Sequence, residues 1–204
     1  MKIKKEITKV IPYLIKRLIP KIITNTILSI KYKAIIDPSA EIYFSNKIKI
    51  GKKTIIDKCF LDCKSKNKYG ITIGYNSFIH RGVIIQTFND SIKIGNNVSL
   101  QPNCLRNGCG NLRIGDNCRI ATNTIIGGAR HEFMDKNKLI IEQPVIKKET
   151  KIGNDVWVGA GAIIINGVKI GNKCVIGAGS VVIRDIPDNS VGVGVPAKVI
   201  KKIS

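Results

Sequence analysis

Aliphatic residues recur at every sixth position over most of this chain, and this period constrains the fold more than any other feature. The longest run is unbroken and comprises Ile152, Val158, Ile164, Ile170, Ile176 and Val182. A period of six fits neither the 3.6-residue repeat of an α-helix nor the two-residue alternation of a half-buried strand. Three short strands per turn of a parallel β-helix satisfy it, because each coil buries its aliphatic side chains by stacking on the next.

An aliphatic residue followed by glycine marks successive coils. These pairs start at Ile50, Ile73, Ile94, Ile114, Ile152 and Ile170, at intervals of 23, 21, 20, 38 and 18 residues. If three strands of six residues make one coil, the excess in each interval must leave the coil as a loop at a corner. The sequence therefore predicts short loops near residues 62 to 70, 87 to 91 and 106 to 111, and a protruding loop over residues 127 to 150.

Small or β-branched residues occupy a second register, four positions after the aliphatic one. They are Thr54, Ser77, Val83, Val98, Cys104, Cys118, Thr124, Val156, Ala162, Val168, Cys174 and Ser180. A large side chain would overfill the corner where two flat sheets meet. Three cysteines belong to this register, so we interpret them as core residues, whereas Cys59, Cys63 and Cys109 fall outside it.

The composition limits the classes of function. Aromatic residues make up only 5% of the chain, as expected for a narrow interior filled by isoleucine and valine. The cysteines form no C-x-x-C pair and only two histidines are present, so we expect no metal site and a reducing, cytoplasmic location. The formal net charge of +20 favours phosphates, acidic glycans or anionic lipid. No aromatic platform accompanies this charge, so we do not expect nucleic acid as a partner.

Residues 1–34 form a separate segment with apolar residues spaced by three and four, which predicts an amphipathic helix with lysines on its other face. Charges interrupt the apolar stretch, so it predicts neither a transmembrane helix nor a secretory signal. Two interpretations stay open. The helix packs on the protein body or a neighbouring subunit, or residues 1–30 make peripheral contact with the anionic inner face of a membrane.

Three further stretches carry a family resemblance. Residues 152–162 read IGNDVWVGAGA, residues 176–182 read IGAGSVV, and residues 192–199 read GVGVPAKV. With the Ile/Val-Gly pattern, they resemble the hexapeptide-repeat acyltransferases, in particular the branch of galactoside, maltose and polysaccharide O-acetyltransferases. The resemblance covers roughly residues 36 to 203. It implies an all-β fold, a left-handed parallel β-helix over residues 35–204, a homotrimer, and acetyl-CoA held between neighbouring subunits as co-substrate.

His131, in the long loop, is the candidate catalytic base. Histidine suits proton transfer near neutral pH, and this loop resembles the protruding loop whose histidine serves as base in the family. The other histidine, His80, directly follows Ile79 in the strand register and is interpreted as structural. By the same resemblance Glu142 orients the imidazole of His131, with the adjacent Glu132 as an open alternative.

The resemblance assigns the acyl and coenzyme sites to the C-terminal coils. The backbone N–H of Ala160 is the candidate donor to the oxyanion. Trp157 is expected to point outward, either beside the acyl group or into a plain subunit contact. The coenzyme contacts carry over to Ala160, Ala178, Ile183, Arg184, Lys198 and Lys201.

The expected function is O-acetylation of a carbohydrate, with a bacterial surface or capsular polysaccharide or its precursor as acceptor. Small-sugar members of the branch use an acid in the coil before the catalytic loop, and residues 100–109 contain none. Simple galactoside or maltose specificity is therefore not expected. Transfer to the nitrogen of a nucleotide-linked amino sugar is the alternative, because the same fold and base would serve it.

Overall fold

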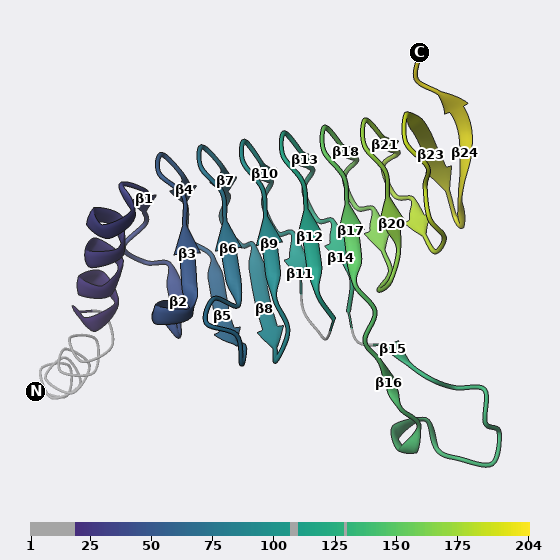
Figure 1. Cartoon of the computed structure of the whole chain (residues 1–204), viewed down its shortest axis with the longest axis horizontal. Helices are drawn as coiled ribbons and strands as arrows, with labels where there is room; N and C mark the ends of the chain where they lie inside the picture. The colour runs from purple at the N-terminus through teal and green to yellow at the C-terminus, as the bar shows by residue number, and fades with distance from the viewer. Residues whose placement is uncertain (1–18, 107–109, 129) are drawn as a thin grey trace, which may run out of the picture.

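The structure, a computed structural model, describes residues 19–106, 110–128 and 130–204. It is a β-solenoid of about seven turns with one α-helix near the N-terminus (Figure 1). The chain winds through three parallel sheets, called sheets A, B and C here, and each complete coil adds one short strand to every sheet. The parallel β-helix predicted from the period of six is confirmed.

The three sheets run the length of the molecule. Sheet A consists of β1 (Ile35–Ile36), β4 (Ile55–Ile56), β7 (Phe78–Ile79), β10 (Ser99–Leu100), β13 (Arg119–Ile120), β18 (Trp157–Val158), β21 (Val175–Ile176), β23 (Ser190–Gly194) and β24 (Ala197–Lys202). Sheet B consists of β2 (Glu41–Tyr43), β5 (Phe60–Lys64), β8 (Ile84–Phe88), β11 (Leu105–Arg106), β14 (Ile125–Ile126), β19 (Ile163–Ile164) and β22 (Val181–Val182). Sheet C consists of β3 (Ile48–Ile50), β6 (Ile71–Ile73), β9 (Ile92–Ile94), β12 (Leu112–Ile114), β17 (Thr150–Ile152) and β20 (Lys169–Ile170).

Two elements depart from the parallel winding. Strand β24 folds back antiparallel on β23 and ends sheet A. A separate antiparallel hairpin, β15 (Arg130–His131) with β16 (Val145–Ile146), lies outside the coils. Short 3-10 helices cover Ser45–Lys47 and Ile140–Glu142.

Inward-facing aliphatic side chains stack in columns along the solenoid axis. One such column in sheet A comprises Ile56, Ile79, Leu100, Ile120, Val158 and Ile176. All of these side chains are buried. Burying an aliphatic side chain of this size contributes about 1.5–3 kcal/mol relative to exposing it, so the stacked columns are the main stabilising feature of a fold with few aromatic rings.

The small residues predicted for the corners are buried throughout, from Thr54 to Ser180. Cys118 shows how closely the corner is filled, because its thiol contacts the Gly153 carbonyl of the next coil at 3.1 Å. Desolvation by burial raises the pKa of Cys118 to about 11, which keeps it a neutral thiol near pH 7. The interpretation of the register cysteines as core residues is therefore confirmed.

Cys59 also belongs to a corner column, although its spacing in the sequence excluded it. Phe60 pairs with Ile84, which sets Cys59 opposite Val83 on the next coil. The turn before Cys59 is one residue shorter than the turn before Val83, and this shifts the cysteine out of the period of six. Its thiol is nevertheless buried, and desolvation raises its pKa to about 12. Cys63 is buried as well, whereas Cys109 lies outside the described residues.

Some of the extra residues predicted to form loops near residues 62 to 70 and 87 to 91 lengthen the strands that precede those loops. Strands β5 and β8 are five residues long and pair from Phe60–Ile84 to Lys64–Phe88. Because adjacent coils carry insertions at the same corner, the backbone groups of one insertion can satisfy those of the other.

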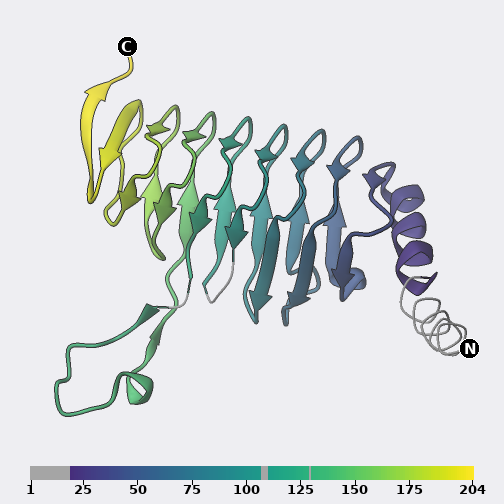
Figure 2. The same ribbon diagram turned by 180° about the vertical axis from the view of Figure 1, so that it is seen from behind.

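The α-helix over residues 19–32 covers the N-terminal end of the solenoid (Figure 2). The buried amide of Asn25 donates hydrogen bonds to the carbonyls of Asp37, Pro38 and Ala40. The hydroxyl of Tyr32 donates to the Ile48 carbonyl at 2.9 Å. Residues 1–18 of the predicted amphipathic segment lie outside the described residues. Within the described residues, no helix has the length and apolar character needed to cross a membrane.

Candidate active site

The long insertion leaves the solenoid between β14 and β17 and projects away from the coils (Figures 1 and 2). Its base is the hairpin of β15 and β16, in which Arg130 pairs with Ile146 and His131 with Val145. The Glu132 N–H donates to the Pro144 carbonyl at 2.8 Å and extends the pairing by one step. His131 is therefore held on a two-stranded stem and not on a free loop.

Asn166 fastens the neck of this hairpin to the next coil. It follows β19 and is only 8% exposed. Its amide nitrogen donates to the Gly128 carbonyl at 2.9 Å and to the Ile146 carbonyl at 3.3 Å. One side chain therefore holds both the segment that leaves the coils and the segment that returns to them. Sequence reasoning missed Asn166. Its signal is a polar residue at a corner of the coil that directly follows the longest insertion.

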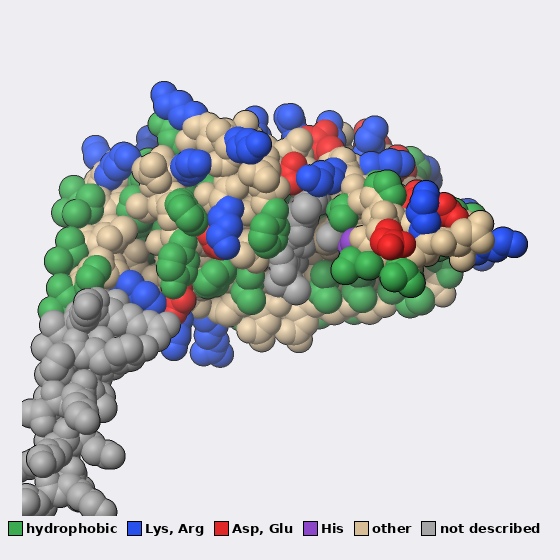
Figure 3. All heavy atoms as spheres, turned by 90° about the horizontal axis from the view of Figure 1, so that it is seen from below, with side chains coloured by type: hydrophobic (Ala, Val, Ile, Leu, Met, Phe, Trp, Pro, Cys, Tyr) green, Lys and Arg blue, Asp and Glu red, His purple; other side chains and the backbone are tan. Residues whose placement is uncertain are grey.

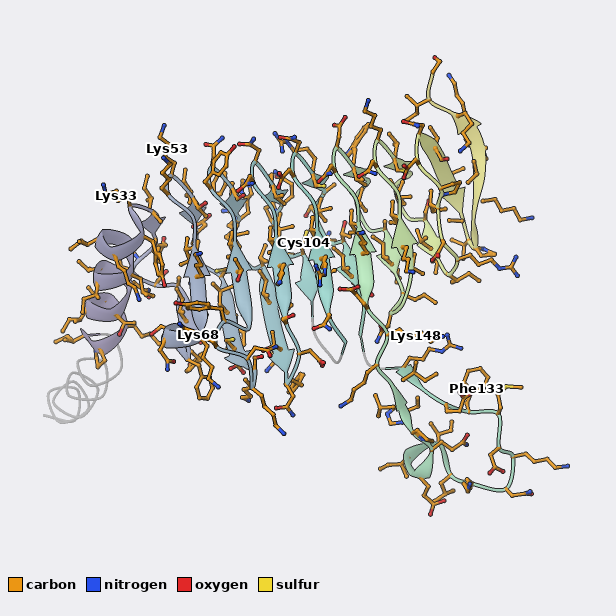
Figure 4. The ribbon with its side chains drawn as sticks, viewed as in Figure 1. Lys33, Lys53, Lys68, Cys104, Phe133 and Lys148 are labelled. Atoms are coloured by element: carbon orange, nitrogen blue, oxygen red, sulfur yellow. The ribbon has the colours of Figure 1, made fainter. Side chains whose placement is uncertain are left out.

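The tip of the insertion folds around Gln143, which is also buried. The Gln143 side chain donates to the carbonyls of Asp135 and Lys138 and accepts from the Asp135 N–H. The loop thereby displays a set of exposed apolar side chains, namely Phe133, Met134, Leu139, Ile140 and Ile141. Figure 4 shows Phe133 on the projecting loop and Lys148 where the loop rejoins the coils. Such a rigid apolar surface is typical of a contact with another protein surface.

The imidazole of His131 lacks an orienting partner within the described chain. Its Nδ1 atom is buried and has no hydrogen-bond partner among the described residues. The Glu142 carboxylate accepts from the Leu139 N–H at 3.0 Å, at the start of the 3-10 helix. The Glu132 carboxylate accepts from the Phe133 N–H. The structure therefore brings neither predicted carboxylate to His131, and their orienting role stays a prediction.

Trp157, Ala160 and Ala178 lie at or next to the corner between sheets A and B. The Trp157 side chain is 58% exposed and points outward from β18, as expected. Ala160 and Ala178 occupy equivalent turn positions on adjacent coils, linked by the hydrogen bond from the Gly179 N–H to the Ala160 carbonyl. Among the described residues, the N–H of Ala160 has no acceptor. Beside it, a Cβ built at Gly161 would meet nothing within 4 Å, so the backbone is open to a ligand.

The remaining predicted coenzyme contacts lie in two places, the C-terminal end of sheet A and the corner between sheets B and C. Lys198 and Lys201 are exposed on β24, where they pair with Val193 and Val191 at the end of sheet A. Ile183 and Arg184 are exposed after β22, at the corner between sheets B and C. The hairpin neck lies at this second corner, because the Gly127 N–H donates to the carbonyl of Ile164 in the next coil.

The predicted site residues therefore form two groups at opposite ends of the sheet B strands. Trp157, Ala160, Ala178, Lys198 and Lys201 belong to the side of sheet A. His131, Glu142, Ile183 and Arg184 belong to the side of sheet C. No described contact joins His131 to Trp157 or Ala160 in one chain. An arrangement that needs all of them must combine two chains.

His80 lies apart from the hairpin, on the turn after β7. Its ring stacks on Phe78 with a centroid distance of 3.7 Å, and its Nε2 lies 3.3 Å from the amide nitrogen of Gln101. Desolvation lowers the pKa of His80, although the nearby Asp57 carboxylate opposes that shift. These contacts agree with a structural role. The described residues contain no group of three or more potential metal ligands.

Three comparisons bear on what this arrangement does. The family described as Bacterial transferase hexapeptide (six repeats) matches residues 149–184. A galactoside O-acetyltransferase of Escherichia coli is 37% identical over 65% of this chain and 64% of its own length. The match thus spans less than two thirds of that relative.

Solved structures share the fold over most of the chain. The crystal structure of a maltose O-acetyltransferase from Clostridium difficile is 30% identical, with a TM-score of 0.50, over 88% of this chain and 74% of that one. An N-acyltransferase from Bacillus cereus, solved with dTDP-4-amino-4,6-dideoxyglucose and coenzyme A, has a TM-score of 0.61 at 22% identity over 89% of both chains. The first likeness extends to sequence, whereas the second shows the fold alone.

Proposed function

Because the chain belongs to the hexapeptide-repeat acyltransferase family, we propose that it transfers the acetyl group of acetyl-CoA to a hydroxyl of a carbohydrate. The proposed acceptor is a bacterial surface or capsular polysaccharide or its precursor. The observation that carries this proposal is the position of His131, which the stem of β15 and β16 and the Asn166 contacts hold clear of the coils. Similarity to galactoside and maltose O-acetyltransferases supports transfer to oxygen.

The proposed active site lies between two subunits of a homotrimer. Two observations support this arrangement. The hairpin with His131 and the corner with Ala160 lie at opposite ends of the sheet B strands, and the projecting loop displays apolar side chains that no described residue of its own chain covers. A neighbouring subunit placed under the loop would cover those side chains and bring its own Ala160 corner to His131.

His131 acts as the general base in this proposal. It accepts the proton of the acceptor hydroxyl as the oxygen attacks the thioester carbonyl, and a positioned base contributes about 10²- to 10⁴-fold to such a step. The Ala160 N–H of the partner subunit donates to the oxyanion that develops on that carbonyl. The acyl carbon–sulfur bond then breaks, and the proton held by His131 is returned to the thiolate that leaves. Glu142 or Glu132 would orient the imidazole once the subunits assemble.

The coenzyme would lie along the Ala160 and Ala178 corner. Both turns expose backbone with small side chains, which suits the close approach of a narrow pantetheine arm. Lys198 and Lys201 of the same chain would supply cations for its phosphates. Arg184 and Ile183 lie at the opposite corner, so a further cation and an apolar contact would come from these residues of the neighbouring subunit. Trp157 would cover the acyl group.

Replacing His131 by alanine tests the mechanism. Release of coenzyme A thiol should fall by about 10²- to 10⁴-fold, while the mass of the assembly in solution stays unchanged. His80→Asn is the matched control and should retain activity, because His80 stacks on Phe78 away from the hairpin. Near wild-type turnover by His131→Ala in an intact assembly would contradict the role of His131.

The acceptor class is tested by turnover against free sugars, purified acidic polysaccharides and nucleotide-linked amino sugars. The proposal expects turnover with a polysaccharide or its precursor and an ester product that mild alkali removes. The similarity in fold to an N-acyltransferase solved with a nucleotide-linked amino sugar makes amide formation the alternative. An alkali-stable product formed only with an amino sugar would establish that alternative instead.

We also propose that the protein resides in the cytoplasm and touches the anionic inner face of the membrane through its N-terminal segment. The cysteines of the described residues are unpaired, in keeping with a reducing compartment. The helix over residues 19–32 leaves one apolar side uncovered, with Ile19, Ile23, Ile27 and Ile30 exposed. Isoleucines beside lysines are the composition that an interfacial helix requires.

Vesicle binding tests this contact. Ile23→Asp together with Ile27→Asp should weaken partition onto phosphatidylglycerol vesicles by about tenfold or more, because the apolar side of the helix is lost. Ile200→Asp, at the opposite end of the molecule and also exposed, is the control and should bind as the wild type does. Equal binding by all variants, or no binding by the wild type, would refute the membrane contact.

A further inference from the structure

A column of cations follows the outer surface of sheet C from one end of the solenoid to the other. The outward positions of its strands are in register and comprise Lys49, Thr72, Lys93, Arg113, Lys151 and Lys169. Neighbouring strands lie about 4.8 Å apart, so the column extends over about 24 Å. Five of its six positions carry a positive charge. We call it the cation column.

The cation column is poorly neutralised. All five cations are exposed. In the part of the chain that the structure describes, Arg113 is paired with Glu149 at 2.6 Å, whereas the four lysines form no ion pair. At the C-terminal end, the Asp185 carboxylate accepts from the backbone N–H of Lys169. Like charges this close repel one another, which is a cost that a bound anion would relieve.

We propose that the cation column binds a linear acidic glycan lengthwise, and this proposal rests on the proposed function because the glycan would be the acceptor polymer. The column is one residue wide and straight, which matches a single extended chain with repeated negative charges and not a compact partner. A solenoid produces this match directly, because its strands repeat at a spacing comparable with the length of one sugar ring.

The chemistry of sheet C argues against two other polyanions. Its outward positions carry no aromatic ring, so nothing there can stack on the bases of a single-stranded nucleic acid. They also carry no apolar side chain that could enter a bilayer, whereas the helix over residues 19–32 exposes several isoleucines.

The cation column also passes the base of the hairpin. The insertion that carries His131 returns to the solenoid at β17, whose outward residue is Lys151. On the neighbouring strand β12, Arg113 reaches Glu149 at the end of the same insertion. A glycan lying on the column would therefore meet the hairpin midway, with sugar units on either side of the reacting one.

The test measures binding of fluorescently labelled polygalacturonate oligomers and heparin oligomers, without acetyl-CoA. The variant Lys49→Glu with Lys93→Glu and Lys151→Glu should weaken binding about 30-fold or more at low salt and reduce its dependence on ionic strength. The matched control is Lys52→Glu with Lys58→Glu and Lys68→Glu, three exposed lysines outside the column, and it should lose less than about threefold. The corresponding Lys→Gln triple tests the same face without charge reversal, and thermal unfolding verifies that each variant is folded.

Equal losses in the column and control triples would overturn the proposal, because they would indicate attraction by net charge alone. Binding by the wild type to single-stranded DNA or to phosphatidylglycerol vesicles through these lysines, but not to the glycans, would overturn it as well. The assay requires no turnover. Failure to bind glycan therefore leaves the proposed acetyl transfer standing, and loss of activity in His131→Ala leaves the binding result standing.

Discussion

At the scale of single residues, two buried polar side chains fix the position of the insertion that carries His131. Asn166 hydrogen-bonds to both backbone segments of the hairpin neck, and Gln143 holds the loop tip in its folded form. Neither residue needs to touch a substrate. Each restricts where His131, the proposed base, can lie, and misplacing a catalytic group by about 1 Å can cost about 10²-fold in rate.

Removing the Asn166 amide tests this positioning role. Asn166→Asp keeps the shape of the side chain but cannot donate to the Gly128 and Ile146 carbonyls, so both Asp and Ala variants should lose about 10- to 100-fold in kcat. The KM for acetyl-CoA should change little, because the Ala160 corner is untouched. Asn137→Ala, on the exposed loop, is the control. A fall in thermal midpoint with unchanged kcat would leave Asn166 only a structural role.

At the scale of elements, the repeat determines each coil, and its interruptions determine what differs between coils. The period of six predicted the coils, their buried columns and the position of the long insertion. It left Cys59 outside the corner register because a turn that is one residue shorter changes the spacing along the sequence while the register in space is preserved. It also missed that β5 and β8 extend together, since strand pairing between two insertions depends on both at once.

The candidate site was predictable to a similar degree. His131 and Ala160 were assigned by resemblance, and their roles stay predictions; the structure places them at opposite ends of the sheet B strands. Asn166 was missed, because a single polar side chain carries no periodic signal. The expected orienting carboxylate also stays unverified, since Glu142 caps its own 3-10 helix.

The corner columns should tolerate exchange between small residues but not enlargement. Cys118 lies between Val98 and Val156 of the adjacent coils, so Cys118→Val should change the free energy of unfolding by less than about 1.5 kcal/mol. Cys118→Leu should lower it by about 1–3 kcal/mol, because its extra atoms meet the Gly153 carbonyl. Calorimetry at one protein concentration measures both. Equal stability of the two variants would show that the corner is less closely filled than the structure indicates.

At the scale of the whole molecule, the outer faces of the sheets of the solenoid differ in chemistry. Sheet C carries the cation column. The outward positions of sheet B are largely apolar and include the exposed Ile84, Ile125 and Ile163. Figure 3, from below, shows hydrophobic side chains across the face of the coils and the hairpin, with many of the Lys and Arg side chains along the upper edge of the view. Two copies would repel through sheet C, so sheet B and the loop are the surfaces suited to assembly.

A site shared between subunits predicts that two inactive variants restore each other. His131→Ala lacks the proposed base. Ala160→Trp blocks the acyl corner with a side chain that the exposed turn can accommodate without unfolding. Each should be inactive alone. If the two variants are co-expressed in equal amounts and assemble at random into trimers, about one quarter of the subunit interfaces combine the intact His131 of one chain with the intact Ala160 of the other. Activity should therefore return to about one quarter of the wild-type value. If the site were contained in one chain, every subunit of the mixture would stay defective, and the mixture would be no more active than its components.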